Sequence, residues 1–258
     1  MKSMNLWRGA LLLALVAGPA IYLFADDKAA GDAAAATASD ASRAERAPEQ
    51  GFTPLFDGKT LNGWEGREGF WSVKDGCITG QTKEAFGGPN TFLVWKGGDV
   101  SDFELRLEYK IIGGNSGIQY RSKIVDPKLF RVGGYQADFE AGTTYSGINY
   151  EELGRGILAQ RGTRVTLEGD NAKKEEKLPM TSEQLQKAIR QDDWNGYVVI
   201  ARGPRLTHMI NGNTTSEVID NTDKAAKSGV LALQLHAGPP MTVQFRNIRM
   251  KKLDGAAK

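Results

Sequence analysis

Alternation of hydrophobic and polar residues dominates the chain after Gly51. In residues 102–112 apolar and charged side chains exchange at every step, and this period of two predicts a half-buried antiparallel strand. The apolar row consists of Phe103, Leu105, Leu107, Tyr109 and Ile111, and the charged row of Glu104, Arg106, Glu108 and Lys110. Residues 230–236 and 242–246 alternate in the same way. Weaker strand patterns cover residues 70–73, 77–80, 92–95, 117–121, 135–139, 197–201 and 206–210.

Turn and cap residues separate these strand patterns. Asp75-Gly76 and Asn211-Gly212 each lie between two strand-like runs, which is the strongest short-range signal of a β-hairpin. One short helix is predicted after Thr181, where Gln184 completes a capping box. The charged stretch 169–179 is interpreted as a solvated loop. Many short strands, one helix and no alternation of strands with helices predict an all-β fold, a sandwich or jelly roll.

The N-terminus has a different pattern. Lys2 and Arg8 precede the almost wholly apolar run 10–24, which is the layout of a secretory signal and is short for a membrane-spanning helix. Residues 1–25 are therefore predicted to be a signal peptide, with an uncleaved N-terminal anchor as the alternative. Residues 26–50 are rich in alanine and lack aromatic side chains, so a flexible linker is expected. The folded domain is predicted to span residues 51–258, exported to the periplasm or the cell exterior and tethered to the membrane if the N-terminus stays uncleaved.

Composition excludes several classes of function. Lysine and arginine total 33 against 31 acidic residues, and no basic cluster stands out, so no nucleic-acid partner is expected. Cys77 is the only cysteine and the chain has two histidines. An intramolecular disulfide is therefore excluded, and a zinc site of nitrogen and sulfur ligands is not expected. Stable membrane insertion of the folded domain is not expected either.

Three strands combine an apolar row with a row of functional groups. The functional rows are Gln119 with Arg121, Gln136 with Asp138 and Glu140, and Gln234 with His236. Amides, carboxylates, a guanidinium and an imidazole that converge in fixed directions can recognise vicinal hydroxyls. A row that merely faces water remains the alternative for each single strand. A common site requires the three strands to be neighbours, which spacing does not show.

Other polar residues have a structural and a functional interpretation. His208 shares its face with Leu206 and Ile210, which favours a structural histidine, whereas His236 is the better candidate for acid–base chemistry. Asn115 is placed at the rim of the polar face. Residues 150–152 and Arg155 form a loop of mixed charge for which ion pairing is the simpler interpretation.

An ordered set of short motifs resembles the 3-keto-disaccharide hydrolase family. The motifs lie at residues 51–64 (GFTPLFDGKTLNGW), 102–105 (DFEL), 115–121 (NSGIQYR), 134–138 (GYQAD), 194–197 (WNGY), 211–212 (NG), 233–236 (LQLH) and 245–248 (FRNI). The resemblance implies a concanavalin A-like jelly roll, similar to lectins and glucanases. It also implies cleavage of glycosides already oxidised at carbon 3 of the sugar.

The implied chemistry requires a base, an acid and a partner for an enolate oxygen. A carbonyl at carbon 3 acidifies the hydrogen on carbon 2, so that β-elimination of the carbon 1 substituent can follow proton removal. On this resemblance Asp138 and His236 are the predicted base or acid, with Glu152 as a further candidate. Arg121, with Asn115 and Gln136, is predicted to hold the keto or enolate oxygen.

The remaining expectations concern hydroxyl binding, metal and an alternative function. Gln119 and Gln234 are predicted to bind sugar hydroxyls. No cofactor is predicted; if a divalent metal takes part, Asp138, Glu140 and His236 are the expected ligands. The expected partner is a carbohydrate, a 3-keto-glycoside or related saccharide. A non-catalytic, lectin-like carbohydrate-binding module is the alternative function.

Overall fold

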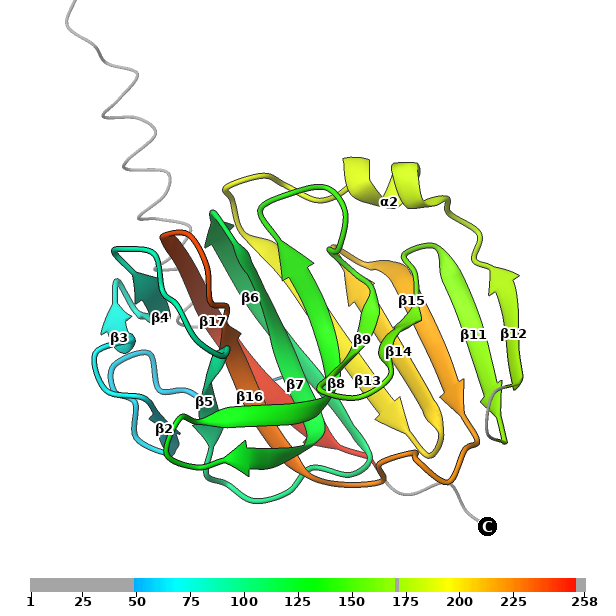
Figure 1. Cartoon of the computed structure of the whole chain (residues 1–258), viewed down its shortest axis with the longest axis horizontal. Helices are drawn as coiled ribbons and strands as arrows, with labels where there is room; N and C mark the ends of the chain where they lie inside the picture. The colour runs from blue at the N-terminus through cyan, green and yellow to red at the C-terminus, as the bar shows by residue number, and fades with distance from the viewer. Residues whose placement is uncertain (1–48, 170–171, 254–258) are drawn as a thin grey trace, which may run out of the picture. The chain divides into compact units, whose positions relative to one another are not determined.

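Residues 49–169 and 172–253 are described by the computed structural model, and they belong to the unit Pro48–Lys258. The predicted signal segment and nearly all of the predicted linker lie outside the described residues. Strands of this unit form two sheets that pack face to face, and α2 (Ser182–Lys187) lies at one end of them (Figure 1). The predicted all-β sandwich with one short helix is thereby confirmed.

The ten-stranded sheet follows the order β12-β11-β15-β14-β13-β6-β17-β4-β3, and β1 pairs with β17. Its members are β1 (Thr53–Pro54), β3 (Trp71–Lys74), β4 (Cys77–Thr82), β6 (Phe103–Ile112), β11 (Thr163–Glu168), β12 (Ala172–Lys177), β13 (Asn195–Arg202), β14 (Arg205–Ile210), β15 (Asn213–Asp220) and β17 (Met241–Lys252). Neighbouring strands are antiparallel except for β11 and β15, which are parallel.

The seven-stranded sheet follows the order β10-β9-β8-β7-β16-β5-β2, with every pair antiparallel. Its members are β2 (Trp64–Gly66), β5 (Thr91–Trp95), β7 (Asn115–Asp126), β8 (Arg131–Glu140), β9 (Asn149–Glu152), β10 (Gly156–Ala159) and β16 (Val230–Leu235). The strands predicted at 117–121 and 135–139 lie within β7 and β8, and the strand predicted at 230–236 covers β16, which ends one residue earlier.

The core lies between the two sheets. In β6 the apolar row predicted from the sequence is buried and the charged row is half-buried, as the alternation indicates. Aromatic rings from both sheets meet there, with Tyr109 of β6 and Phe139 of β8 only 3.9 Å apart between ring centroids. Full burial of each large side chain contributes about 1.5–3 kcal/mol, so this layer is the main source of stability.

Turn and cap predictions agree with the structure. Asp75-Gly76 joins β3 to β4 and Asn211-Gly212 joins β14 to β15, and all four residues have positive φ, as a type I′ hairpin turn requires. The Thr181 side chain accepts from Gln184 N, and the Gln184 side chain accepts from Thr181 N, which is the predicted capping box.

The solvated loop predicted at 169–179 is wrong in part. Residues 172–177 form β12, an edge strand that pairs with β11 over its whole length. All six of its residues are exposed, so its charged side chains are solvated on both faces. Without a buried face the strand has no alternating pattern, which is why periodicity does not reveal it. Charged residues on an edge strand also discourage pairing with other chains.

The far end of the β7–β8 hairpin folds across the outer face of the seven-stranded sheet (Figure 1). Phe92 N of β5 donates to Phe130 O at 3.0 Å, although β16 and β7 separate β5 from β8 in the sheet. Val132 and Phe130 pack on Phe92, Val94 and Ala232 as a small second apolar cluster. This segment, residues 123–133, is called the folded hairpin below; it covers one end of the sheet face.

Within the described residues, no helix combines the length and apolar character that crossing a membrane requires.

Candidate functional site

Three strands predicted to carry functional groups are neighbours in the order β8-β7-β16. In the register Gln119 lies opposite Gln136, Gly117 opposite Asp138, and Ala232 opposite Gln119. Alternate residues share a face, so Gln119, Gln136, Asp138 and Gln234 lie on one face of the sheet, away from the core. The condition for a common site is therefore met.

Three glutamine amides on this face are connected. Gln136 Oε1 accepts from Gln119 Nε2 at 2.8 Å and from Gln234 Nε2 at 3.0 Å. Because its oxygen is occupied by two donors, the Gln136 amide must direct its NH₂ group the other way, toward Asp138. The bond from Gln136 Nε2 to Asp138 Oδ2 is 3.1 Å long.

Gly117 makes room for this arrangement. A Cβ atom at Gly117 would lie 2.5 Å from Gln136 Cγ, so only glycine allows the Gln136 side chain to cross β7.

Asp138 is the focus of the polar network. Its Oδ1 accepts from Asn115 Nδ2 at 2.7 Å and its Oδ2 from Gln136, so two amides hold the carboxylate in place. Only 6% of Asp138 is exposed. Burial raises the pKa of Asp138 from 3.8 to about 7, against the lowering effect of the two amide bonds and with a further increase from Glu140 and Glu152. A carboxyl group with such a pKa can both accept and donate a proton near neutral pH.

Glu152 and His236 form a second part of the site, toward the folded hairpin. Asn90, just before β5, connects their segments: its Nδ2 donates to Glu152 Oε1 at 3.1 Å, and its Oδ1 accepts from Ala237 N at 2.9 Å. Burial raises the pKa of Glu152, while the bond from Asn90 and the charges of His236 and Arg131 act in the opposite direction. His236 Nδ1 contacts the carbonyl oxygen of Ala237, which can only accept. This contact assigns Nδ1 as a donor and leaves Nε2 as the nitrogen that can meet a ligand.

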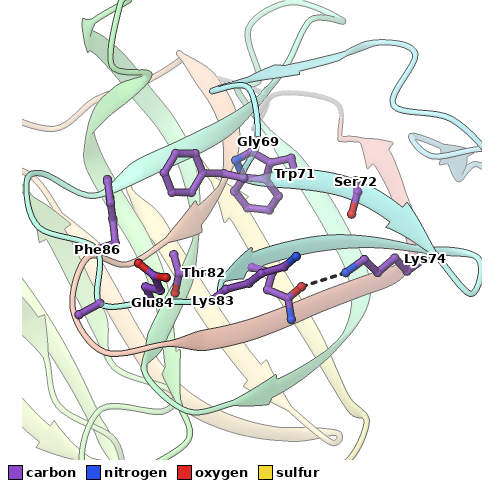
Figure 2. A pocket seen from close by; sticks show the side chains of 11 residues that line it. Gly69, Trp71, Ser72, Lys74, Thr82, Lys83, Glu84 and Phe86 are labelled. Atoms are coloured by element: carbon purple, nitrogen blue, oxygen red, sulfur yellow. Dashed lines mark hydrogen bonds between the residues drawn. The ribbon is translucent and has the colours of Figure 1, made fainter.

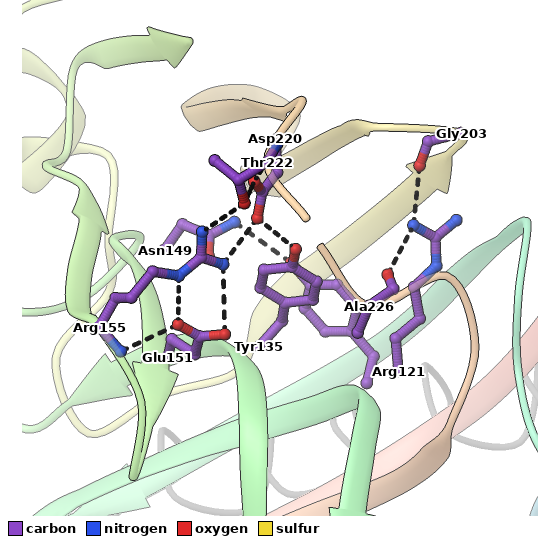
Figure 3. Close-up of polar contacts among 10 residues, drawn as sticks. Arg121, Tyr135, Asn149, Glu151, Arg155, Gly203, Asp220, Thr222 and Ala226 are labelled. Carbon is purple, nitrogen blue, oxygen red and sulfur yellow. Dashed lines mark hydrogen bonds and ion pairs between the residues drawn. The ribbon is translucent and has the colours of Figure 1, made fainter. Parts of the chain in front are cut away.

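The predicted position of Arg121 on the polar face is wrong. A β-bulge follows Tyr120, and Arg121 has φ +48°, so the side chain leaves the alternation of the strand. Its guanidinium binds Asp102 Oδ1 at 2.7 Å, Ser101 O at 2.7 Å and Gly203 O at 2.8 Å, in the loops of the other sheet. Figure 3 shows the bond to Gly203. Arg121 is 2% exposed and connects the two sheets, so it does not face Asp138.

Gln119 and Gln234, which the sequence predicts to bind sugar hydroxyls, are not exposed for direct contact with a ligand. Gln119 and Gln234 are fully buried and Gln136 nearly so, and Ser122 Oγ occupies Gln119 Oε1 at 2.6 Å. These side chains lie beneath the accessible surface and orient Asp138. Gln234 Oε1 is one of several buried polar atoms without a hydrogen-bond partner among the described residues.

The conditional metal ligands do not come together. Glu140 Oε1 accepts from Thr144 N and from Tyr145 N, the latter at 2.8 Å, so this carboxylate holds the 141–147 loop. Among the described residues, no three histidine, cysteine, aspartate or glutamate side chains are grouped as a metal site would require. Asp138, Glu140 and His236 are therefore not a ligand set in this structure.

The predicted loop of mixed charge at residues 150–152 is wrong, because these residues belong to strand β9. Tyr150 lies opposite Gln136 and Glu152 opposite Gly134, so both belong to the face of Asp138. Glu151 faces the other way, and Arg155 Nε binds its Oε2 at 2.5 Å, so the predicted ion pairing is confirmed (Figure 3). Residues 149–152 (NYEE) show no alternation of apolar and polar side chains, so periodicity does not reveal this strand. No sequence signal indicates Asn90, whose partners are 62 and 147 positions away.

His208 is a structural histidine, as predicted. It is fully buried, its Nε2 lies 2.8 Å from Tyr120 Oη, and its Nδ1 lies 3.2 Å from Ile148 O. Burial lowers its pKa to about 4, so the imidazole is neutral at physiological pH.

Comparison with known sequences identifies the family. The 3-keto-alpha-glucoside-1,2-lyase-like domain matches residues 51–251. The chain belongs to this family. Over 90 residues it is 37% identical to a Bacteroides thetaiotaomicron protein named 3-keto-disaccharide hydrolase. That match covers 30% of the chain and 30% of the relative, so it spans less than a third of either protein.

Solved structures show the same fold. A predicted glycosyl hydrolase of Parabacteroides distasonis aligns with a TM-score of 0.53 and 20% identity, over 80% of this chain and 95% of that one. A Bacillus subtilis protein with a galectin-like fold aligns with a TM-score of 0.52 and 12% identity, over 78% and 94% of the two chains. At these identities the likeness concerns the fold alone, and it confirms the predicted lectin-like β-sandwich of the 3-keto-alpha-glucoside-1,2-lyase-like domain.

Proposed function

We propose that the domain cleaves glycosides that carry a ketone at carbon 3 of the sugar. The observation that supports this most is Asp138, a buried carboxyl group with a pKa of about 7. Two amides orient it on the polar part of the sheet face. Membership of the 3-keto-alpha-glucoside-1,2-lyase-like family supports the choice of substrate.

In the proposed reaction Asp138 acts as the base. It takes the proton from carbon 2, and the electron pair of the C–H bond is delocalised into the carbon 3 carbonyl as an enolate. Re-formation of that carbonyl places a double bond between carbons 1 and 2 and expels the oxygen substituent of carbon 1. Addition of water across the double bond returns a proton to carbon 2 and completes the hydrolysis.

Glu152 and His236 are the two candidates for the acid that protonates the leaving oxygen. A raised pKa keeps Glu152 protonated to a higher pH than an ordinary glutamate, which suits proton donation. Asn115 is the proposed donor to the keto oxygen, in place of Arg121, which the structure directs elsewhere. We place the reaction outside the cytoplasm, on the basis of the apolar run at residues 10–24.

The decisive experiment is cleavage of 3-keto-glucosides by the purified chain and its Asp138→Asn variant, followed by release of the aglycone. We expect Asp138→Asn to reduce kcat by about a hundredfold or more, because removal of a general base costs roughly 10²–10⁴ in rate. A parallel reaction with a chelator measures whether a divalent metal takes part.

Asp75→Asn is the matched control. It makes the same chemical change in the β3–β4 turn and leaves an Asn-Gly pair, which the type I′ turn accepts. Equal turnover by Asp138→Asn and the wild type would refute the proposal, and sugar binding without turnover by either would favour the lectin-like alternative.

A further inference from the structure

A hollow of about 670 Å³ lies at the edge of the ten-stranded sheet, between β3 and the segment that follows β4 (Figure 2). Ser72 and Lys74 line it from β3, and residues 81–86 line its other side. None of the residues of the candidate site contributes to its wall. Its volume falls in the range of about 300–1,000 Å³ that is typical of small-molecule sites.

Three aromatic side chains form the apolar part of the wall. Trp71 lies against two glycines: a Cβ at Gly80 would be 2.7 Å from its Cζ3 atom, and a Cβ at Gly66 would be 2.9 Å from its Cδ1 atom. Phe70 and Phe86 are 4.9 Å apart between ring centroids, and both belong to the lining. Gly80 belongs to β4 and Gly66 to β2 of the other sheet, so the indole packs between the edges of the two sheets.

Hydrogen-bonding groups surround these rings. Gln81 accepts from Lys74 Nζ at 2.9 Å and donates to Thr242 Oγ1 at 2.9 Å, so its amide is held at the wall. Ser72, Lys83 and Glu84 add a hydroxyl and both signs of charge.

A sugar ring matches this combination. Its C–H face is apolar and packs on aromatic rings, while its hydroxyl groups both donate and accept hydrogen bonds around its edge. A purely apolar ligand would not use the hydroxyl, amide and charged groups of the wall, and a small anion would gain nothing from the aromatic rings.

The segment 83–90 joins this hollow to the candidate site. In its middle, Phe86 and Gly238 exchange two backbone hydrogen bonds of 2.8 and 2.9 Å, and Gly238 is two residues after His236. At its end, Asn90 binds Glu152 and Ala237 N. One short segment therefore forms a wall of the hollow and also anchors the polar site.

We propose that the hollow is a second saccharide-binding site, which binds a further sugar unit in addition to the one acted on at Asp138. Its ligand class rests on the proposed function, but its contacts involve none of the proposed catalytic groups.

The test is binding of maltotetraose, cellotetraose and laminaritetraose to the purified full chain by calorimetry. None of these probes carries a ketone at carbon 3, so cleavage does not interfere. We expect at least one of them to bind, and Phe86→Ala and Ser72→Trp to weaken its Kd by about fivefold or more, through loss of an aromatic contact or filling of the hollow. Trp194→Ala is the aromatic control, because this indole, which packs under Arg246 at 3.9 Å, does not line the hollow, whereas Phe86 does.

Two results would overturn the second site: no binding of any tetrasaccharide, or unchanged affinity in both hollow variants. Circular dichroism and the urea midpoint show whether each variant is folded. Cleavage of a short 3-keto-glucoside is measured in parallel. Tetrasaccharide binding without that cleavage would refute the proposed function and keep the second site, and cleavage without tetrasaccharide binding would do the reverse.

Discussion

Asp138 shows how one residue acquires its properties from its surroundings. Aspartate ionises at about 3.8 when solvated, and here burial raises the pKa to about 7 although two amides donate to the carboxylate. The amides therefore fix the direction of the carboxylate without cancelling the cost of burying its charge. A base of this strength is suited to removing a proton next to a ketone at neutral pH.

A stability measurement tests this pKa independently of activity. The native state retains a proton on Asp138 between pH 4 and 7, and the unfolded state has already lost it. The free energy of unfolding of the wild type should therefore fall with rising pH in this window, by about 1.4 kcal/mol per pH unit relative to Asp138→Asn. Urea unfolding of both proteins at several pH values measures this difference. A constant difference across the window would show that burial does not raise the pKa.

At the scale of elements, the folded hairpin depends on a sharp bend where β7 and β8 leave the sheet. Arg121 has φ +48° on one strand, and Gly134 has φ +140° on the other. A Cβ at Gly134 would lie 2.8 Å from Ser122 Cα, so the strands approach more closely than any side chain permits. This bend places residues 130–132 over Phe92 and Ala232 and defines one end of the site face.

Gly134→Ala should therefore destabilise the protein by roughly 1–3 kcal/mol, because the new methyl group meets backbone atoms and the φ value disfavours any L side chain. Urea unfolding measures the loss, and hydrogen exchange should show it first in residues 123–133. Gly196→Ala in β13 is the control, since its Cβ would meet nothing closer than 3.9 Å. Equal midpoints for the two variants would contradict the role assigned to the bend.

At the scale of the whole described unit, polar side chains from the two sheets contact one another across the interface. Tyr135 of β8 donates to Asp220 Oδ2 of β15 at 2.5 Å, and Arg155 Nη2 binds the same oxygen at 2.6 Å (Figure 3). Tyr120 of β7 and His208 of β14 form a second link, and Arg121 with Asp102 forms a third. These links fix the relative position of the sheets in a way that non-directional apolar packing does not.

Arg155→Met should lower the free energy of unfolding by about 2 kcal/mol or more, because the Asp220 carboxylate, 1% exposed in its side chain, loses its cationic partner. Arg164→Met is the matched control: its guanidinium pairs with Glu217 at 2.5 Å but is 38% exposed, so a loss below about 1 kcal/mol is expected. Unfolding in urea measures the loss of stability in both variants. Similar losses would show that burial does not distinguish the Arg155–Asp220 pair from the Arg164–Glu217 pair.

The class of fold could be predicted from the sequence, because it follows from patterns among residues that are close together in the chain. Period-two alternation in β6, the Asp-Gly and Asn-Gly turns and the Thr181 capping box all concern residues close together in the chain. The ordered motifs were also sufficient for the family. The face shared by Gln136 and Asp138 followed from simple alternation, which holds wherever a strand is regular.

Tertiary structure alone decided which strands are neighbours and where the alternation fails. The bulge after Tyr120 turns Arg121 from the predicted site into a link between sheets, and β12, with no buried face, shows no period at all. Asn90 binds Glu152 across 62 positions of the chain, although β5 and β9 are not neighbours in the sheet. Such contacts join residues far apart in the chain, and the pKa of Asp138 depends on the same long-range burial, so no local pattern contains them.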